Sequence, residues 1–442
     1  DNGFYKFSPE GTMSYIFVRV TNNLIDHASE KEIKDFVLSY LLTTDDLSVY
    51  NYFAEHTKYF REDFLTLIAS INVFFIADTK DVSYLYYINC AVKITKNDII
   101  LIDYLDLGGY VWRDHVIDRI FTLCQVRDCN YKTFISNISG EDDSRIISMQ
   151  STIGYLLHGW KNLSYCPAVI LNDEIISENP EGGTGKGLFI NALAKMKKCV
   201  TIDGKSFSFE KSFAYQLVST DTQIICFDDV KKSFDFEKLF SVITEGLTIE
   251  KKNKDSLKIP FEKSPKVALT TNYALKGKGS SFERRKWDLE LAQFYTKDFT
   301  PLVEFGQLMF GEWDDNEWCQ FDNYMMSNLQ LYLDKGLIKG NFVNKKIKDL
   351  SGETSHEFIE WCGLVGNSQP NDKLKPNQRV YKTELYDDFV EEFPDNAPKS
   401  KFTVPRRKFY MWLQAYSLYK FDVELTENKD LGGRYFIFGS ND

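Results

Sequence analysis

The pattern of apolar and polar residues along the first third of the chain predicts a helix and a β-hairpin. Apolar residues from 33 to 41 recur at the spacing of one helical face, and Ser29 with Glu32 forms a capping-box pattern just before them. Residues 84–94 and 99–104 are rich in Tyr, Ile and Val, and an Asn-Asp pair lies between them. Such a pair is typical of the turn that joins two strands.

Apolar runs of strand length alternate with helical periods in the middle of the chain. Three of these runs lie at residues 168–171, 223–229 and 266–272. Strands that alternate with helices predict an α/β domain built on a parallel sheet. Helical periods return from 300 to 340, where Trp and Phe side chains supply apolar anchors.

The last hundred residues predict three helices followed by a hairpin. A capping box at Thr354 and Glu357 would open the first helix, residues 382–393 would form the second, and Pro405 suits the first turn of the third. Two strands are expected at its end, at residues 423–425 and 435–438. This order of elements is that of a winged helix.

Together these patterns predict three domains, because one hydrophobic core rarely organises more than about 250–300 residues and this chain has 442. We expect a helical and β-hairpin region at residues 1–150, an α/β domain at 151–340 and a small winged-helix-like domain at 341–442.

Composition and charge restrict the partners of the chain. No apolar run reaches the roughly 18 residues of a membrane span, so a membrane partner is not expected. The eight cysteines include no C-x-x-C pair, which favours free thiols in a reducing compartment over a zinc site. The net charge of −11 leaves only local clusters of Lys and Arg for binding nucleic acid. Because the chain begins at Asp1, we expect it to be a piece of a longer polypeptide.

The strongest chemical signal is a glycine-rich segment from Pro180 to Gly187, with the sequence PEGGTGKG. Glycines let successive backbone N–H groups face a phosphate, and Lys186 would reach the β- and γ-phosphates of ATP. Pro180 stands where the phosphate-loop pattern has its first Gly, and Gly187 replaces the Ser or Thr that binds magnesium. An ordinary glycine-rich turn is the alternative. The candidate phosphate-binding residues are Gly182, Gly183, Thr184, Gly185, Lys186 and Gly187.

Polar side chains at the ends of the next two apolar runs complete a candidate hydrolytic site. Asp228 would hold the magnesium shell, and Asp229 would orient or deprotonate the attacking water. Asn272 would position that water against the γ-phosphate. An acidic or amide residue after a strand is otherwise a common turn residue. Arg284 or Arg285 could reach the nucleotide of a neighbouring subunit as an arginine finger, and a solvated basic turn is the alternative.

In this order and at this close spacing, these motifs resemble those of the superfamily 3 helicases, in particular the phage and plasmid primase-helicases related to the poxvirus type. Residues 180–187 look like their Walker A motif, 224–229 like Walker B, 243–254 like B-prime and 270–272 like motif C. Two further segments are similar to the parts before their ATPase: residues 87–95 and 153–157. The resemblance implies an AAA+-like P-loop NTPase fold, ATP and Mg²⁺ as cofactors, and a homo-hexameric ring with the N-terminal region as a collar.

The resemblance also implies where single-stranded DNA binds. The B-prime motif of this family is a hairpin that projects into the channel of the ring, and ammonium groups on it can follow phosphates without reading sequence. A solvated surface hairpin is the alternative. The candidate DNA-binding residues are Lys251, Lys252, Lys254, Lys276 and Lys278. Weaker candidates lie on the third C-terminal helix: Arg406, Arg407 and Lys408.

The sequence therefore predicts an ATP-dependent DNA helicase that moves 3′ to 5′ on single-stranded DNA during replication of a phage, virus or plasmid. It would act in the cytoplasm of a bacterial host, with a primase or polymerase domain in the same polypeptide or replisome. One alternative is a nucleotide-regulated DNA-binding scaffold without efficient hydrolysis, which Gly187 favours. The other is a different P-loop enzyme, such as a packaging motor or a small-molecule kinase. A kinase would have no use for the lysines from 251 to 254.

Overall fold

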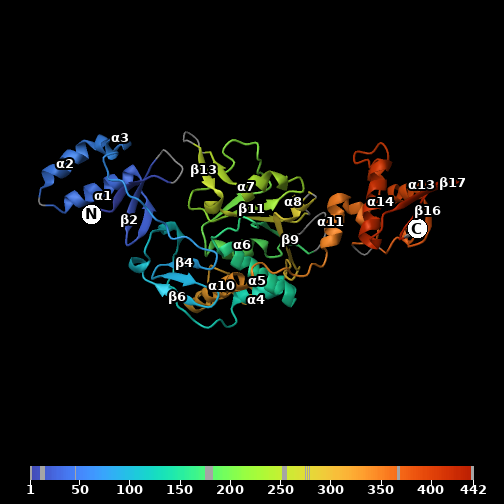
Figure 1. Ribbon diagram of the computed structural model, residues 1–442, viewed down its shortest axis with the longest axis horizontal. Coiled ribbons are helices and arrows are strands. Elements are labelled where there is room, and N and C mark those ends of the chain that lie inside the picture. The colour runs from blue at the N-terminus through green and yellow to red at the C-terminus, as the bar shows by residue number, and fades with distance from the viewer. Residues whose placement is uncertain are drawn as a thin grey trace.

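The structure is a computed structural model of mixed α/β type with an elongated outline (Figure 1). N-terminal strands and helices lie at one end, a five-stranded parallel sheet lies in the middle, and C-terminal helices lie at the other end. None of the helices in the described part of the chain is long and apolar enough to span a bilayer. The structure describes residues 2–9, 15–44, 46–174, 183–250, 256–273, 275, 277, 279–365 and 369–439.

Two four-stranded sheets and three helices make up the N-terminal part. The capping box of Ser29 and Glu32 is confirmed, since each residue's side chain binds the other's backbone N–H at the start of α1. The sheet orders are β1-β2-β3-β7 and β6-β5-β4-β8. The strands are β1 (Phe4–Phe7), β2 (Ile16–Thr21), β3 (Leu24–His27), β4 (Ser83–Tyr87), β5 (Ala91–Ile94), β6 (Ile99–Ile102), β7 (Val111–Trp112) and β8 (Val116–Ile117). The helices are α1 (Glu30–Leu42), α2 (Leu47–Glu55) and α3 (Glu62–Leu65).

The prediction of one long strand at residues 84–94 is wrong, because this segment folds back on itself as β4 and β5. Asn89 lies in the turn between them and explains the fold-back. Its side-chain amide donates to Phe121 O at 3.1 Å, and Phe121 N donates to its Oδ1 at 2.9 Å. The predicted turn between 94 and 99 is confirmed, since β5 pairs with β6 in antiparallel fashion.

The parallel sheet of the central part has the strand order β10-β11-β14-β9-β15. An antiparallel pair, β12 with β13, stands apart from it. The strands are β9 (Ala168–Asp173), β10 (Cys199–Asp203), β11 (Ile224–Val230), β12 (Gly246–Ile249), β13 (Leu257–Pro260), β14 (Lys266–Thr271) and β15 (Lys286–Leu291). The helices are α4 (Asn130–Ile138), α5 (Asp143–Leu157), α6 (Lys186–Ala194), α7 (Phe240–Thr244), α8 (Ser280–Glu283), α9 (Pro301–Phe305) and α10 (Asp315–Lys335).

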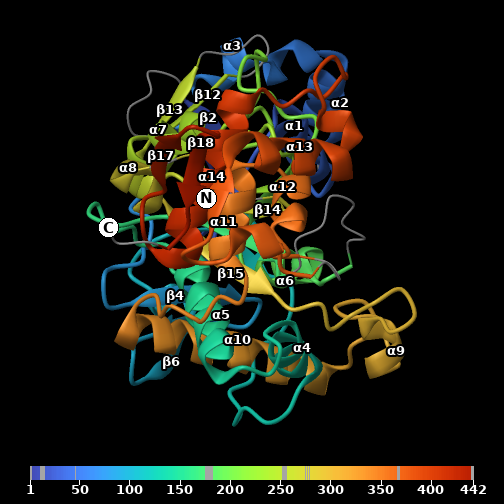
Figure 2. The same ribbon diagram turned by 90° about the vertical axis from the view of Figure 1, so that its right-hand side faces the viewer.

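The alternating side chains of each strand place a core on both faces of this sheet. Val169 and Leu171 pack on one face with residues of α4, α5, α6 and α10, and Figure 2 shows α5 crossing α10 on this side. Ala168 and Ile170 pack on the other face with residues of α7, α8 and the β12–β13 pair. The first core also takes in Leu85 and Tyr87 of β4. The domain boundary expected at residue 150 therefore falls inside α5, which belongs to this core.

The C-terminal part has its own hydrophobic core, built from helices and a three-stranded sheet of order β16-β18-β17. The cap of its predicted first helix is Ser355 and not Thr354, because Ser355 accepts from Phe358 N, whereas Thr354 donates to Leu350 O and closes the preceding helix. The predicted strand at 423–425 begins only at Thr426, and neither α11 nor β16 was expected. The elements are α11 (Lys345–Glu353), α12 (His356–Trp361), β16 (Arg379–Tyr381), α13 (Lys382–Glu392), α14 (Arg406–Phe421), β17 (Thr426–Asp430) and β18 (Gly433–Ile437).

A buried lysine at the start of β14 is expected to make the stability of the native protein depend on pH. Lys266 Nζ donates to Tyr155 O at 2.5 Å, near the end of α5, and lies 4.0 Å from the centroid of the Tyr155 ring. Burial lowers the pKa of Lys266 to about 7. From about pH 7 to pH 10 the unfolded chain therefore carries a proton that native Lys266 has lost, so stability rises with pH.

We expect the free energy of unfolding of the natural chain to rise relative to that of Lys266→Met by about 1.4 kcal/mol per pH unit over this range. The variant lacks the titrating amine, so the difference between the two proteins isolates its contribution. Urea titrations at pH 7, 8 and 9 measure it. A difference that stays constant with pH would mean that Lys266 keeps its proton in the native state.

Candidate nucleotide-binding site

The connections of the parallel sheet change direction between β9 and β14. From β9 the chain moves to β10 at one edge of the sheet, whereas from β14 it moves past β9 to β15 at the other edge. Right-handed connections that run in opposite directions lie on opposite faces, which agrees with α6 and α8 packing on different faces. Ligands of such sheets bind outside the carboxyl ends of the strands at this point.

The end of the glycine-rich segment forms the start of α6, beside the carboxyl ends of β9 and β14. Gly185 has a φ of +103° and directly precedes the helix, whose first residue is Lys186. A Cβ at Gly185 would lie 2.8 Å from Phe134 Cζ, so both the backbone angle and the packing require glycine. The free N–H groups at the start of α6 form an anion-binding end. Gly182 lies outside the described residues.

Gly187 occupies open space in the first turn of α6. A Cβ built at this position meets no atom of the described residues within 4 Å. The missing hydroxyl of the phosphate-loop pattern is therefore not excluded by crowding, and a serine side chain would fit.

Lys186 lies between the ends of β9 and β14. Its Nζ is 2.5 Å from Asp173 Oδ1 and 2.6 Å from Asn272 Oδ1. The hydroxyl of Thr184 donates to the same oxygen of Asp173 at 2.5 Å and lies 3.3 Å from Lys186 Nζ. The structure thus brings together three residues predicted for the site, Thr184, Lys186 and Asn272. Asp173 was missed, although a carboxylate at the end of the strand before the glycine-rich segment was a readable signal.

The acidic pair lies near the carboxyl end of β11, the strand next to β14. Asp228 Oδ1 accepts from the Thr270 hydroxyl at 2.6 Å, and the N–H of Asp229 donates to the same hydroxyl at 2.7 Å. Asp229 has a φ of +54° at an irregularity in the pairing of β11 with β14. This kink separates the directions of the two carboxylates. Asp229 pairs with Lys205 at 2.5 Å, and neither Lys205 nor Thr270 was predicted.

Arg284 and Arg285 lie at the amino ends of the strands, whereas Lys186 lies at their carboxyl ends. They directly precede β15, which runs parallel to β9, so they lie beside the amino ends of the strands. Arg285 is bound within its own chain, since it donates to Ser281 O at 3.0 Å and its guanidinium lies 4.6 Å from the Phe240 ring. Arg284 is exposed.

The predicted DNA-binding lysines lie outside the described residues: Lys251, Lys252, Lys254, Lys276 and Lys278. The hairpin expected around the first three is present, since β12 pairs with β13 on either side of them. Lys258, on the returning strand, is exposed.

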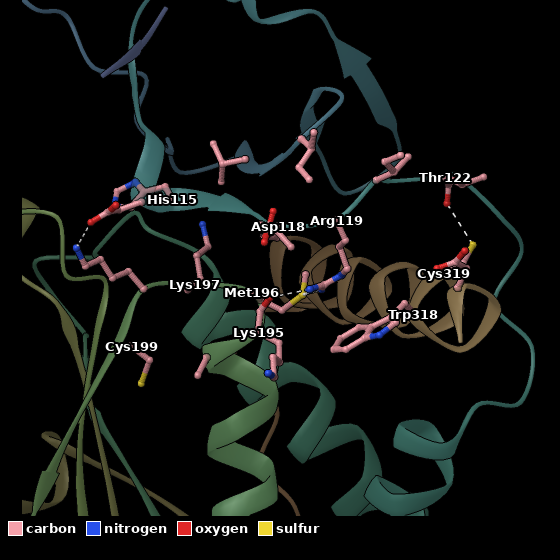
Figure 3. Close-up of a pocket in the computed structure, with 18 residues that line it drawn as sticks. His115, Asp118, Arg119, Thr122, Lys195, Met196, Lys197, Cys199, Trp318 and Cys319 are labelled. Carbon is pink, nitrogen blue, oxygen red and sulfur yellow. Dashed lines mark hydrogen bonds and ion pairs between the residues drawn. The ribbon is translucent and has the colours of Figure 1, made fainter. Parts of the chain in front are cut away.

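A cavity of about 890 Å³ lies at the far end of α6 from Lys186 (Figure 3). Its walls come from Ile88 and three segments: residues 114–122, 194–199 and 315–319. Two of its basic groups are paired within the chain. Arg119 Nε donates to Asp322 Oδ2 at 2.8 Å, and Lys198 Nζ lies 2.5 Å from Asp221 Oδ2. The carboxyl ends of β9 and β14 remain the candidate for a phosphate ligand, because the end of the glycine-rich segment and the start of α6 lie there.

Comparisons with known proteins locate one family match in this region. A family of unknown function (DUF5906) matches residues 179–285, from the glycine-rich segment to Arg285. A search of curated proteins found no match. The chain is similar to an apo structure of the NrS-1 C-terminal region, with 13% identity, a TM-score of 0.40 and coverage of 99% of this chain and 96% of that one. A second structure of that region (305–718) shows 15% identity, a TM-score of 0.36 and coverage of 81% and 96%.

Proposed function

We propose that this chain is the ATP-driven motor of a DNA helicase, with a P-loop core of the superfamily 3 type that hydrolyses ATP between the subunits of a hexameric ring. The observation that carries the proposal is the convergence of Lys186, Asn272 and Asp228 on one edge of the sheet. Lys186 begins a helix after β9, Asn272 follows β14, and Asp228 ends the apolar part of β11, and these three strands are neighbours. Across these strands, Lys186 fits a phosphate site, Asn272 a sensor of the γ-phosphate and Asp228 a magnesium site.

The chemistry of each residue follows from its position. The N–H groups of α6 and the Lys186 ammonium would bind the β- and γ-phosphates and stabilise the charge that develops on them. Asp228, held by Thr270, would bind a magnesium ion together with water and phosphate oxygens, because this ion rarely needs more than one or two carboxylates. Bound there, the ion would neutralise the phosphate charge.

The remaining two residues would handle the attacking water. Asp229 diverges from Asp228 at the kink, which would let it orient or deprotonate that water while Asp228 serves the metal. Asn272 lies between Lys186 and the acidic pair, so its amide would place the water in line with the γ-phosphate.

The placement of Arg284 supports hydrolysis between subunits. The six residues of β15 separate it from the phosphate edge by roughly 20 Å. An exposed arginine at this edge suits a finger for the neighbour's nucleotide, whereas Arg285 serves its own chain. The C-terminal part would be a winged-helix-like domain whose helix α14 carries Arg406, Arg407 and Lys408.

A DNA-binding scaffold without efficient hydrolysis is the second candidate, and Gly187 is the observation that favours it. Turnover of ATP with and without single-stranded DNA separates the two. Turnover that DNA stimulates supports the motor, whereas slow turnover that DNA leaves unchanged supports the scaffold.

The lysines between β12 and β13 allow a test of the proposed binding of single-stranded DNA. Replacing Lys251, Lys252 and Lys254 with alanine removes up to three phosphate contacts. The slope of log affinity against log salt should flatten by roughly two units, since each contact to a single strand contributes about 0.7. Basal ATP turnover should remain, and its stimulation by single-stranded DNA should fall. Fluorescence anisotropy of a labelled oligonucleotide over a salt series measures the slope.

The matched control changes the net charge equally at exposed lysines away from the hairpin: Lys31, Lys80 and Lys335. It should leave the slope unchanged. An equal slope for the natural chain and the hairpin variant would place the DNA elsewhere, beginning with Lys276 and Lys278.

A further inference from the structure

The carboxylate of Asp173 binds two of the groups that would bind phosphate in the proposed site, Lys186 and Thr184. Its side chain is 8% exposed at the end of β9. One carboxylate oxygen accepts from both the Lys186 ammonium and the Thr184 hydroxyl, each at 2.5 Å. These two donors are among those that a nucleotide phosphate would use at the start of α6. The carboxylate thus stands where an anionic oxygen of the ligand would stand.

The backbone of Asp173 is anchored from outside the glycine-rich segment. Its carbonyl oxygen accepts from the Lys348 ammonium, which lies 3.1 Å from Glu290 Oε1 on the neighbouring strand β15. The other oxygen of Glu290 accepts from Val343 N at 2.9 Å. Both Lys348 and Glu290 are buried. Lys348 of α11 therefore holds the end of β9 in place, and Asp173 is presented to Lys186 by a fixed strand.

We propose that Asp173 is an internal substitute for phosphate that restrains nucleotide binding until the nucleotide displaces it. The inference rests on the proposed function, because it assumes that Lys186 binds the phosphates of ATP. A triphosphate that reaches Lys186 must break the ion pair with Asp173 and then share one ammonium with a second anion a few ångströms away. Both effects oppose binding, and both act through the charge of Asp173.

The charge can be removed without changing the shape of the side chain. Asp173→Asn keeps an Oδ1 that can accept from Thr184 and Lys186, but it is neutral. We expect the variant of the full chain to bind ATP more tightly by about tenfold or more, since each tenfold corresponds to about 1.4 kcal/mol of lost competition. Calorimetric titration with ATP in the presence of EDTA measures the affinity, because no divalent ion then screens the carboxylate.

Glu174→Gln is the matched control. It removes the same charge from the adjacent residue, whose carboxylate lies 2.6 Å from Arg145 Nη1. This control should bind ATP as the natural chain does. A gain of the same size in both variants would show a general effect of net charge and would overturn the inference.

The remaining outcomes separate the inference from the proposed function. Equal or weaker binding by Asp173→Asn, beside clear binding by the natural chain, would overturn the inference alone and make Asp173 a positioning carboxylate of the site. Absence of ATP binding by both proteins would overturn the proposed function as well. Asp173→Ser is the second variant if the amide fails to fold, and circular dichroism melts establish folding before each titration.

Discussion

Replacing Lys186 with alanine is expected to abolish ATP hydrolysis, with turnover falling by at least about two to three orders of magnitude. In the proposed site, the ammonium of Lys186 would be the fixed positive charge that faces the phosphates, and it lies 2.6 Å from the amide oxygen of Asn272. Without it, the charge that develops on the γ-phosphate in the transition state loses its preorganised counter-charge. Steady-state release of phosphate at saturating ATP measures the effect.

The other end of α6 offers a control for this variant. Lys195 is the exposed residue that follows the helix, on the far side from the phosphate edge. Lys195→Ala removes the same side chain from the same helix and should keep the natural turnover. Normal hydrolysis by Lys186→Ala would remove the glycine-rich segment from the active site.

The second large effect is expected from Arg284. Its replacement by alanine should lower ATP turnover by about three to five orders of magnitude, the range known for arginine fingers. Binding of single-stranded DNA should remain, because Arg284 belongs to neither the hairpin nor the proposed nucleotide site of its own chain. Since the finger would act on a neighbour, the loss should be repaired in part by mixing subunits.

The mixing experiment joins Arg284→Ala with Lys186→Ala subunits, each inactive alone. In a ring with head-to-tail interfaces, about a quarter of the interfaces then pair an intact pocket with an intact arginine. Phosphate release should reappear in the mixture and in neither pure protein. Arg285→Ala is the matched control and should show no such repair, because Arg285 binds Ser281 and stacks on Phe240 in its own chain. A mixture that stays inactive while its subunits assemble would exclude Arg284 as the finger.

The elements that the sequence predicted well are those whose signals are local. The capping box at Ser29 depends on residues three positions apart, and it is present in the structure. The apolar runs before Asp228 and Asn272 are buried strands, because a run that is apolar on both faces is stable only inside a sheet. Each residue's position at a strand end or a helix start was therefore readable before the fold was known.

The order of the strands was decided only by the tertiary structure. The sequence placed β9, β11 and β14 along the chain, but not β14 between the other two. That order arises because the connection from β9 to β10 and the connection from β14 to β15 run in opposite directions and cover opposite faces of the sheet. It is what brings Asn272 within 2.6 Å of Lys186.

Long-range partners were beyond the sequence for the same reason. Asp173 follows a predicted strand and Thr270 lies in the segment 270–272, but only the fold sets their partners, Lys186 at the start of α6 and Asp228 on the neighbouring strand. The turn at Asn89 depends on Phe121, and the anchor of Asp173 depends on Lys348 in a helix that was not expected. The sequence by itself determined Thr184, Lys186, Asp228 and Asn272 as candidate groups, since these follow from local patterns. Only the packing of distant segments decided which of these groups bind one another. A hydrogen bond between two strands, such as that from Thr270 to Asp228, cannot be read from the spacing of residues along either strand.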